Sequence, residues 1–301
     1  MFSPKRFRVG VAMVAGLALF AISAMGQQQQ PQTPQQQDVQ PLTVGRLRGN
    51  VYWAEGGARY PVGNSGIIIG NTSVIVIDAK STPQSGKDLV DAIAKITPKP
   101  IKTLILTHSN GDHVNGIVSF PPGLTIIAQE NCKKELDAVN AAGGRGGIPA
   151  DRLPTHLVKD KEALTIDGVK LVLLHWAPAH TSGDLVIYLP DQKIVFTGDI
   201  TAQTHPDPSV HGELQASAAG WIESAKGISA LDADIVVPGH YGLQTKAGVE
   251  DQLHAFEERY AKVKALVKEG KSWEEVKAAV GDTEPRQPSA IAIAYQELSK
   301  K

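Results

Sequence analysis

The chain alternates between short β-rich runs and longer amphipathic runs from about Leu42 onward. Two runs of branched aliphatic residues, 66–69 and 74–77, are separated by four residues of turn type, which predicts a β-hairpin. Other short apolar runs predict further strands over residues 101–106, 124–128, 169–174, 185–189, 194–196 and 235–237.

Apolar residues at helical spacing predict the segments that connect these strands. Leu89, Ile93 and Ile96 would share one face of a helix over residues 86–96. The same spacing predicts helices over residues 131–142, 217–231 and 249–268. Strands that follow one another both directly and through helices predict a mixed α/β domain, with two sheets flanked by helices. No Pro-rich or Ser-rich break and no fixed repeat interrupts residues 42–301, so we expect one domain there.

The N-terminal pattern differs from the rest of the chain. A basic start with Lys5, Arg6 and Arg8 leads into the apolar run 9–24, which closes on small residues. This run is shorter than the roughly 20 residues that a spanning helix needs, so residues 1–26 predict a secretory signal peptide rather than a membrane anchor. Residues 27–41 are almost wholly Gln and Pro and predict a disordered tether. We therefore expect export to the periplasm or the extracellular space, without stable membrane insertion after signal removal.

Composition narrows the class of partner. The 301 residues are 42% hydrophobic and carry a formal net charge of -1. Binding to nucleic acid or to an anionic membrane surface favours a basic excess, which is missing here, so a small molecule is the expected partner. Cys132 is the only cysteine, which excludes an intramolecular disulfide, and a small buried residue is its expected role. The oligomeric state is not set by the sequence.

The candidate chemistry lies in the segments directly after the predicted strands. Four β-like runs each end, within a few residues, in a metal-competent side chain: ILTHSNGDH, LLHWAPAH, IVFTGD and IVVPGH. Loops after strands can converge at one edge of a sheet. A single His or Gly-Asp pair is weak evidence, but together the runs predict a metal centre built from His108, Asp112, His113, His180, Asp199 and His240. Histidine and carboxylate ligands suit zinc, and a bridging carboxylate suits a pair of metals.

In this order the motifs resemble the metallo-β-lactamase fold superfamily of metallohydrolases, over roughly residues 51–241. GNSGIIIG and VIVIDAK resemble the opening hairpin of that family. The family loop H-x-H-x-D-H and the later single ligands fall on His108, Asn110, Asp112, His113, His180, Asp199 and His240. The resemblance implies a four-layered αββα sandwich.

The resemblance also implies an assignment of ligands. One metal would be held by His108, Asn110 and His180. The other would be held by Asp112, His113 and His240. Asp199 would bridge the two metals, and Asp78 would support the loop. We expect zinc, one or two per chain, in preference to iron or manganese.

Asn110 stands where the family has its second histidine. Because an amide oxygen binds zinc more weakly than an imidazole nitrogen, the first site should be the weaker one. Three outcomes stay open: one tightly held metal, two metals completed by the amide oxygen or water, or a site without catalysis. Asp199 replaces the cysteine that marks one group of the family's β-lactamases, and resembles instead the thioesterases, lactonases and other hydrolases.

The expected reaction is hydrolysis of an ester, thioester, lactone or lactam, in which water activated by zinc attacks the carbonyl. Asp112 would be catalytic by orienting this water. His205, His211 and Tyr241 would line the pocket, although exposed loop positions are an equally good interpretation of the two histidines. Trp53 and Trp176 would be pocket walls or core residues.

Two other functions stay open at this point. Asn110 is consistent with a degenerate metal-binding protein without turnover, and the ligand types also suit an iron-dependent oxidoreductase on the same fold. The glycine-rich segment 141–147 would be a lid or a surface loop without function. No loop motif identifies the substrate.

Overall fold

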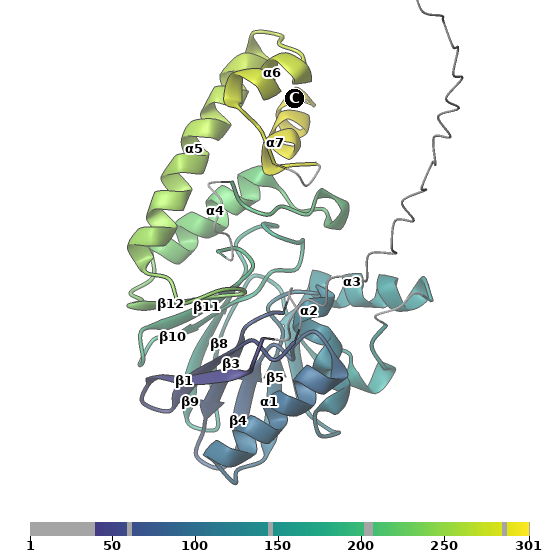
Figure 1. Ribbon diagram of the computed structural model, residues 1–301, viewed down its shortest axis with the longest axis vertical. Coiled ribbons are helices and arrows are strands. Elements are labelled where there is room, and N and C mark those ends of the chain that lie inside the picture. The colour runs from purple at the N-terminus through teal and green to yellow at the C-terminus, as the bar shows by residue number, and fades with distance from the viewer. Residues whose placement is uncertain (1–39, 59–61, 144–146, 202–206, 285–287, 301) are drawn as a thin grey trace, which may run out of the picture. The chain divides into compact units, whose positions relative to one another are not determined.

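Two β-sheets face each other in the computed structural model, which describes residues 40–58, 62–143, 147–201, 207–284 and 288–300 (Figure 1). The first sheet has the strand order β1 (Thr43–Arg48), β2 (Val51–Glu55), β3 (Ser65–Ile69), β4 (Val74–Ile77), β5 (Ile101–Ile105), β6 (Thr125–Gln129) and β7 (His156–Val158). The second has the order β12 (Ile235–Pro238), β11 (Ile194–Gly198), β10 (Val186–Leu189), β9 (Val169–Leu174) and β8 (Lys161–Ile166).

Strand β4 shows why the sheets form separate layers. All four of its residues are buried, because both faces of the strand are covered. Val74 and Val76 pack with helical residues on the outer face, whereas Ile75 and Ile77 join the core between the two sheets. The alternation of side chains along a strand therefore supplies two cores from one short segment.

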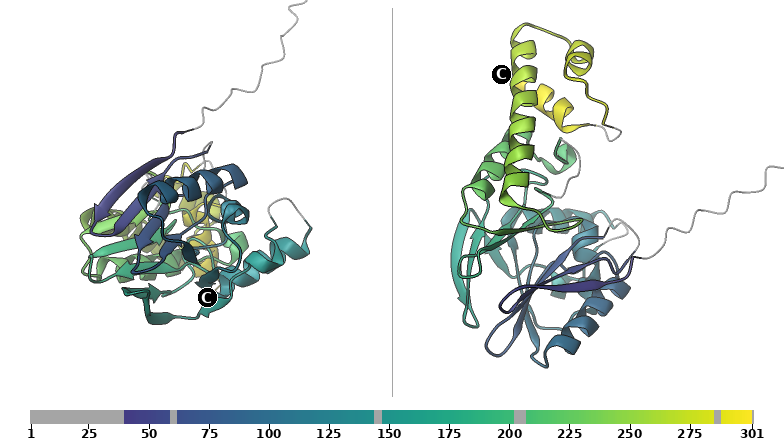
Figure 2. Two further views of the ribbon diagram at one scale, coloured as in Figure 1. Left: turned by 90° about the horizontal axis from the view of Figure 1, so that it is seen from below. Right: turned by 60° about the vertical axis from the view of Figure 1, so that its left-hand side comes forward.

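Helices cover both outer faces (Figure 2). On the first sheet lie α1 (Pro83–Ile96) and α3 (Glu130–Ala141), and on the second lie α4 (Ala218–Ser229) and α5 (Lys246–Lys268). The shorter helices are α2 (Gly111–Val114), α6 (Trp273–Val280) and α7 (Ala290–Ser299), with 3-10 turns at Asn115–Ser119, Ala150–Arg152 and Gly212–Leu214. The predicted order of helix, sheet, sheet and helix is confirmed.

Several predicted elements differ at their ends or lack a counterpart in the prediction. The helix predicted from residue 86 begins at Pro83, after the N-cap Thr82. The sequence did not predict four strands and two helices: the edge strands β1, β7 and β8, the strand β2, and the helices α6 and α7. The predicted signal segment 1–26, most of the tether 27–41 and part of the predicted lid lie outside the described residues. Among the helices that the structure describes, none combines the length and apolar character needed to cross a membrane.

Candidate metal centre

The site lies where several strands end along one edge of the two sheets. β4 and β5 run parallel in the first sheet, and β11 and β12 run parallel in the second. Their C-terminal ends lead into the segments that carry Asp78, His108, Asp199 and His240. The loop after β9 carries His180. Polar side chains at strand ends are thereby held by a rigid scaffold, as a preorganised site requires.

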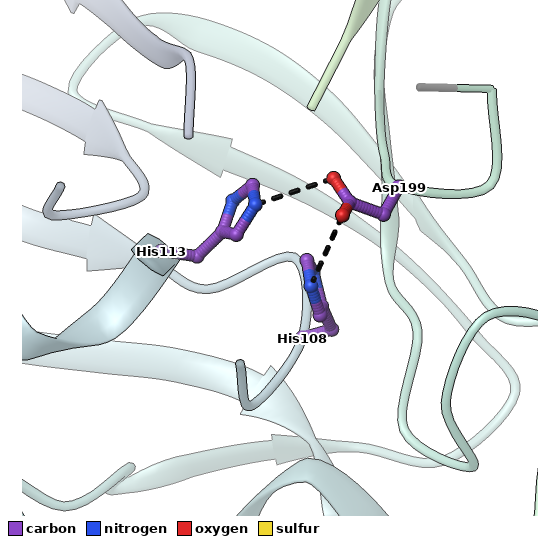
Figure 3. A group of neighbouring side chains, drawn as sticks. All are labelled: His108, His113 and Asp199. Atoms are coloured by element: carbon purple, nitrogen blue, oxygen red, sulfur yellow. Dashed lines mark ion pairs between the residues drawn. The ribbon is translucent and has the colours of Figure 1, made fainter. Parts of the chain in front are cut away.

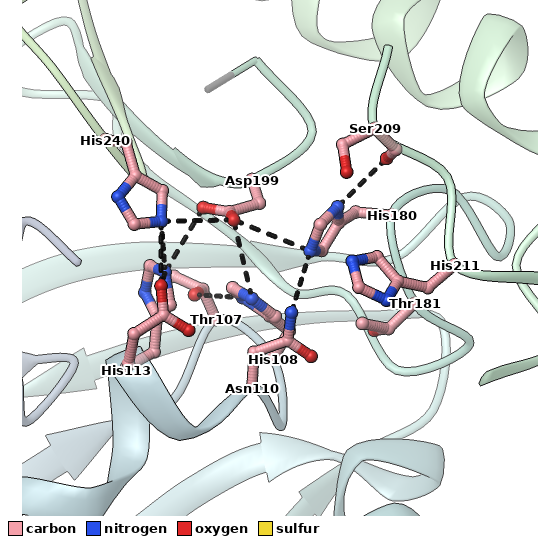
Figure 4. Close-up of polar contacts among 12 residues, drawn as sticks. Thr107, His108, Asn110, His113, His180, Thr181, Asp199, Ser209, His211 and His240 are labelled. Carbon is pink, nitrogen blue, oxygen red and sulfur yellow. Dashed lines mark hydrogen bonds and ion pairs between the residues drawn. The ribbon is translucent and has the colours of Figure 1, made fainter. Parts of the chain in front are cut away.

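Asp199 lies among four histidines (Figure 4), and Figure 3 shows two of them, His108 and His113, with this carboxylate. Its Oδ1 is 3.2 Å from the Nε2 of His113. Its Oδ2 is 3.3 Å from the Nε2 of His240, 3.5 Å from that of His180 and 3.9 Å from that of His108. A carboxylate in this position can contact two cations at once, which is the geometry expected for a bridging ligand.

Asp112 completes the side of the cluster formed by His113 and His240. Its Oδ2 is 3.0 Å from the Nε2 of His240 and 3.7 Å from the Nε2 of His113. The two imidazole Nε2 atoms are 3.2 Å apart. The donor atoms of Asp112, His113 and His240 all lie within 4.8 Å of one another, and those of His108, His113 and Asp199 do so as well. Both groups could hold a metal ion.

Hydrogen bonds behind the histidines determine which ring nitrogen faces the centre. Asp78 accepts from the Nδ1 of His113 at 2.8 Å and from the hydroxyl of Thr107 at 2.7 Å. Because the Thr107 proton is used in this way, its oxygen accepts from the Nδ1 of His108 at 3.0 Å. Both rings are therefore protonated on Nδ1 and direct Nε2 inward, as metal-ligating histidines do.

His180 is oriented in the same manner, although by the backbone. Its Nδ1 donates to the carbonyl oxygen of Ser209 at 2.9 Å. Asp184 organises the loop itself, since its buried carboxylate accepts from the backbone N–H groups of Ala179, His180 and Thr181. The Nε2 of His180 consequently faces Asp199 and Asn110.

Burial and charge divide the histidines into two kinds. Burial lowers the pKa of His108 to about 3 and that of His180 well below its usual value, so both rings are neutral at physiological pH. Burial also opposes charge on His240, but the carboxylates of Asp199 and Asp112 raise its pKa to about 9. Asp199 and Asp78 likewise raise the pKa of His113 against the effect of burial. A cation that binds on this side must displace protons from His113 and His240.

The residues present fit a metal ion. The Nε2 of His108 is buried and has no hydrogen-bond partner in the described part of the chain, so the ring presents an unused lone pair. Gly239 makes room for the centre, since a Cβ at this position would lie 1.9 Å from the Oδ1 of Asp199. Nitrogen and carboxylate donors without a thiolate suit zinc, with iron also possible on ligand type.

Asn110 lies at the centre, on the side of His180. Its Nδ2 is 3.1 Å from the Nε2 of His180, so the amide donates a hydrogen bond to the lone pair that a metal would use (Figure 4). Rotation of the amide by half a turn exchanges its nitrogen and oxygen and presents an acceptor to a cation. In one orientation the Asn110 amide competes with a metal for the Nε2 lone pair of His180, and in the other its oxygen can act as a ligand.

The remaining predicted residues lie at different distances from the centre. The ring of His211 packs edge-on against His180, with centroids 4.5 Å apart. Tyr241 is 43% exposed, and its ring centroid is 6.2 Å from that of His240, which places it at the rim. Trp53 packs against the core between the sheets and Trp176 against the core under α4, which agrees with the core alternative for both residues. His205 lies outside the described residues.

Sequence reasoning did not identify several supporting residues. Thr107 and Asp184 belong to the motifs THSNGDH and AHTSGD, so their proximity to ligands was a usable signal. Glu135 accepts from the hydroxyls of Ser109 and Ser182 and joins two ligand loops, but nothing near it in sequence suggests this. Ser209 acts through its carbonyl oxygen, which has no residue-type signature.

Comparison with known proteins agrees with this geometry. The family described as the metallo-beta-lactamase superfamily matches residues 59–240. The alpha subunit of 2,4-dinitroanisole O-demethylase from Nocardioides sp. is 27% identical over 66% of this chain and 58% of its own length. A linear primary-alkylsulfatase from Pseudomonas sp. is 27% identical over 56% of this chain and 39% of its own length. The chain thus spans only about half the length of these curated relatives.

Solved structures share the fold at lower identity. The inverting sec-alkylsulfatase Pisa1 from Pseudomonas sp. superimposes with a TM-score of 0.69 at 17% identity, over 85% of this chain and 50% of that one. The DIM-1 metallo-beta-lactamase superimposes with a TM-score of 0.60 at 20% identity, over 73% of this chain and 99% of that one. Family match, fold and clustered motifs agree: the chain belongs to the metallo-beta-lactamase superfamily.

Proposed function

We propose that this protein is an exported, zinc-dependent hydrolase that cleaves the acyl bond of a small ester, thioester, lactone or lactam. One observation carries the proposal. The rings of His108, His113 and His180 are each fixed through Nδ1, so that their three Nε2 atoms converge on the carboxylate of Asp199. Such convergence of buried donors is costly for a protein unless a cation compensates it.

The ligands divide as the resemblance implies. His108, His180 and Asn110 would hold one zinc, and Asp112, His113 and His240 the other, with Asp199 between them. Water beside such a cation loses a proton near neutral pH, which supplies the hydroxide for attack on a carbonyl. The relatives named as an alkylsulfatase and an O-demethylase also act on small molecules.

Asp112 is the member of the cluster that water reaches most easily, because its side chain is 20% exposed while those of Asp199 and His240 are 8% exposed. A hydrogen bond from the attacking water to this carboxylate would orient the oxygen lone pair toward the carbonyl. His211, packed against His180, would contact the leaving group on the other side of the centre.

A sulfate ester is the second candidate for the substrate. The similarity to a linear primary-alkylsulfatase favours it. The two ester types differ in the leaving group, because a carboxylate ester is attacked at its acyl carbon and releases an alcohol, whereas a sulfate ester releases an alcohol and sulfate. Both can be tested with the same enzyme preparation.

A substrate screen with metal analysis tests the proposal. Purified protein should contain zinc and hydrolyse at least one of a panel of carboxylate esters, thioesters, lactones, β-lactams and alkyl sulfates. Asp199→Asn and His240→Ala should lower zinc content and turnover together, whereas His156→Ala, which removes a partly exposed histidine paired with Glu162, should change neither. Iron in place of zinc would favour the oxidoreductase, and bound zinc without any turnover the degenerate protein.

The proposed location rests on the sequence alone. The basic start and the short apolar run support cleavage close to Gln27. Mass spectrometry of the native protein should therefore find an N-terminus near this residue in the soluble fraction outside the cytoplasm. An intact Met1 in the membrane fraction would contradict export with cleavage.

A further inference from the structure

A cavity of about 470 Å³ lies between α3 and residues 213–215. None of the proposed metal ligands lines it, yet residues bonded to the ligand loops do. Its volume is within the range of about 300 to 1,000 Å³ that small-molecule sites occupy. The position and chemistry of this cavity indicate which part of a substrate it would receive.

Two hydrogen-bonded contacts join the cavity to the metal centre. Glu135, in its wall, accepts from Ser109 at 2.5 Å and from the Ser182 hydroxyl at 2.6 Å. Ser109 stands between His108 and Asn110, and Ser182 follows His180 by two residues. The wall of the cavity and the ligand loops are therefore one hydrogen-bonded unit.

The opposite wall approaches the same side of the centre. Glu213 lines the cavity and accepts from the Nδ1 of His211 at 2.7 Å. His211 in turn packs against His180. The cavity therefore lies on the side of the metal centre formed by His180 and Asn110, separated from His180 by one residue, His211.

Several polar groups of the cavity, those of Asn131, Lys134 and Glu135, already have partners within the protein. The Nζ of Lys134 donates to the side-chain oxygen of Asn131 at 2.8 Å, and Asn131 donates to the carbonyl of Ser182. Both carboxylate oxygens of Glu135 are occupied by serine groups. These bonds leave little for a polar ligand to use.

Apolar side chains form the remaining surface. Ala138, Val139 and Ala142 come from α3 and its end, and Leu214 comes from the opposite wall. Val139 is 40% exposed despite being aliphatic. Two carboxylates, of Glu135 and Glu213, against the single ammonium of Lys134 disfavour an anionic ligand. An apolar, neutral group matches this surface best.

We propose that the cavity binds the neutral apolar chain, acyl or alkyl, of the substrate whose ester group reacts at the metal centre. This inference rests on the proposed hydrolase function and assigns its substrate class. Each methylene buried from water contributes about 0.8 kcal/mol, or roughly fourfold in kcat/KM. A substrate with an eight-carbon chain should therefore be preferred over a two-carbon one by at least about tenfold, even when only part of the chain enters.

Tryptophan substitutions on α3 test the assignment. Ala138 and Ala141 are both exposed on this helix, but only Ala138 lines the cavity, so Ala138→Trp fills it and Ala141→Trp is a matched control. The measured quantity is the ratio of kcat/KM for 4-nitrophenyl octanoate to that for 4-nitrophenyl acetate. Ala138→Trp should lower this ratio by about tenfold, whereas Ala141→Trp should preserve the wild-type ratio.

Calorimetric binding of octan-1-ol to the three proteins separates the two proposals. If no ester is hydrolysed but octan-1-ol binds to the wild type and to Ala141→Trp, and more weakly to Ala138→Trp, the apolar site stands and the hydrolase proposal fails. If esters are hydrolysed at a chain-length ratio that Ala138→Trp leaves unchanged, the assignment of this cavity is overturned. Absence of both chain-length preference and octan-1-ol binding overturns it as well.

Discussion

Asn110 shows how one side chain can set the number of metals. The Nδ1 atoms of His108 and His113 are hydrogen-bonded so that Nε2 faces the centre, but the Nε2 of His180 faces the Asn110 amide at 3.1 Å. A cation at this position must compete with that hydrogen bond or wait for the amide to rotate. On the side formed by Asp112, His113 and His240 the competitors are protons, because nearby carboxylates raise the pKa values of both histidines.

We predict that the protein carries nearer one zinc than two when zinc is limiting. Asn110→His restores a nitrogen donor and should raise the affinity of the weaker site by roughly 10 to 100-fold, the scale of even indirect changes at metal ligands. Calorimetric zinc titration of both forms measures the two affinities. Two equally tight sites in the wild type, unchanged by the histidine, would mean that Asn110 does not act at a metal.

Lys80 is a buried lysine whose surroundings lower its pKa. Its side chain is fully buried, and its Nζ donates to the carbonyls of Ala54 at 2.8 Å and Gly63 at 2.9 Å. Burial lowers the pKa of Lys80 to about 7, although Asp78 and Glu55 act in the opposite direction. Gly63 also donates its N–H to the carbonyl of Asp112, so Lys80 holds the segment that contacts this ligand.

The lowered pKa of Lys80 predicts a pH-dependent contribution to stability. Between pH 7 and about 10.4 the unfolded chain keeps the Lys80 proton while the folded protein loses it, so raising the pH stabilises the folded state. The free energy of unfolding of the wild type, relative to that of Lys80→Met, should therefore increase by about 3 kcal/mol from pH 7 to pH 9.5. Urea denaturation with a metal chelator measures it, and a difference independent of pH would show that Lys80 stays charged throughout.

At the scale of elements, close backbone contact holds α1 beside the 3-10 turn Asn115–Ser119, which directly follows α2 and His113. A Cβ on Gly86 would lie 2.3 Å from the carbonyl oxygen of Gly116. Because the oxygen that this Cβ would meet belongs to the backbone of Gly116, no side-chain rotation can relieve the contact. The position of His113 thus depends on the absence of a side chain in a neighbouring helix.

Gly86→Ala should accordingly destabilise the protein by about 1 to 3 kcal/mol, the usual cost of an overpacked interior. Gly248→Ala is the matched control, because Gly248 is also helical, in α5, and its nearest neighbour would be 3.6 Å away. That variant should be neutral or slightly stabilised, as helix propensity favours alanine. Equal urea midpoints for the two variants would show that α1 shifts without cost.

The elements that could be predicted are those whose burial is visible in a few adjacent residues. Strands such as β4 and β5 are covered on both faces and appear as continuous aliphatic runs. Helix α7 was not predicted, because its sequence AIAIA alternates as a strand would, while all five residues are buried within the helical packing. Strand β8 has every second residue only half-buried and lies at a sheet edge, which weakens its apolar pattern.

In the candidate site, too, some residues could be predicted from the sequence and others could not. Candidate ligands could be identified because each is a distinctive residue type after a strand. The contacts that orient them could not, since the Ser209 carbonyl and the Glu135 carboxylate come from segments remote in sequence. The apolar cavity beside α3 has no sequence signature either, because its alanines and leucine are ordinary helix and turn residues until the opposite wall is placed.

At the scale of the whole folded unit, helices beyond the family match reach back to the metal centre. The match ends at residue 240, and α5 follows it. Arg259 of α5 binds the buried carboxylate of Asp207, with 2.7 Å from Nε to Oδ1 and 2.9 Å from Nη2 to Oδ2. Two residues after Asp207, the carbonyl of Ser209 accepts from His180. The C-terminal helices thereby help to fix the orientation of His180.

Arg259→Gln should loosen this connection, because it leaves the Asp207 carboxylate buried without its ion-pair partner. We predict that zinc affinity at the site of His180 falls by about 10 to 100-fold while the site of His240 keeps its affinity. Calorimetric zinc titration separates the two, and ¹⁵N NMR of metal-free protein should show His180 losing its fixed Nδ1–H form. Arg152→Gln is the control, because it removes another arginine whose contacts lie away from the metal centre. Arg152 donates to the backbone carbonyls of Phe120 and Pro121. If Arg259→Gln only impaired folding, both zinc sites would lose affinity to the same extent. If Arg259→Gln folds and the zinc affinity at His180 is unchanged, the C-terminal helices stabilise the fold without positioning this ligand.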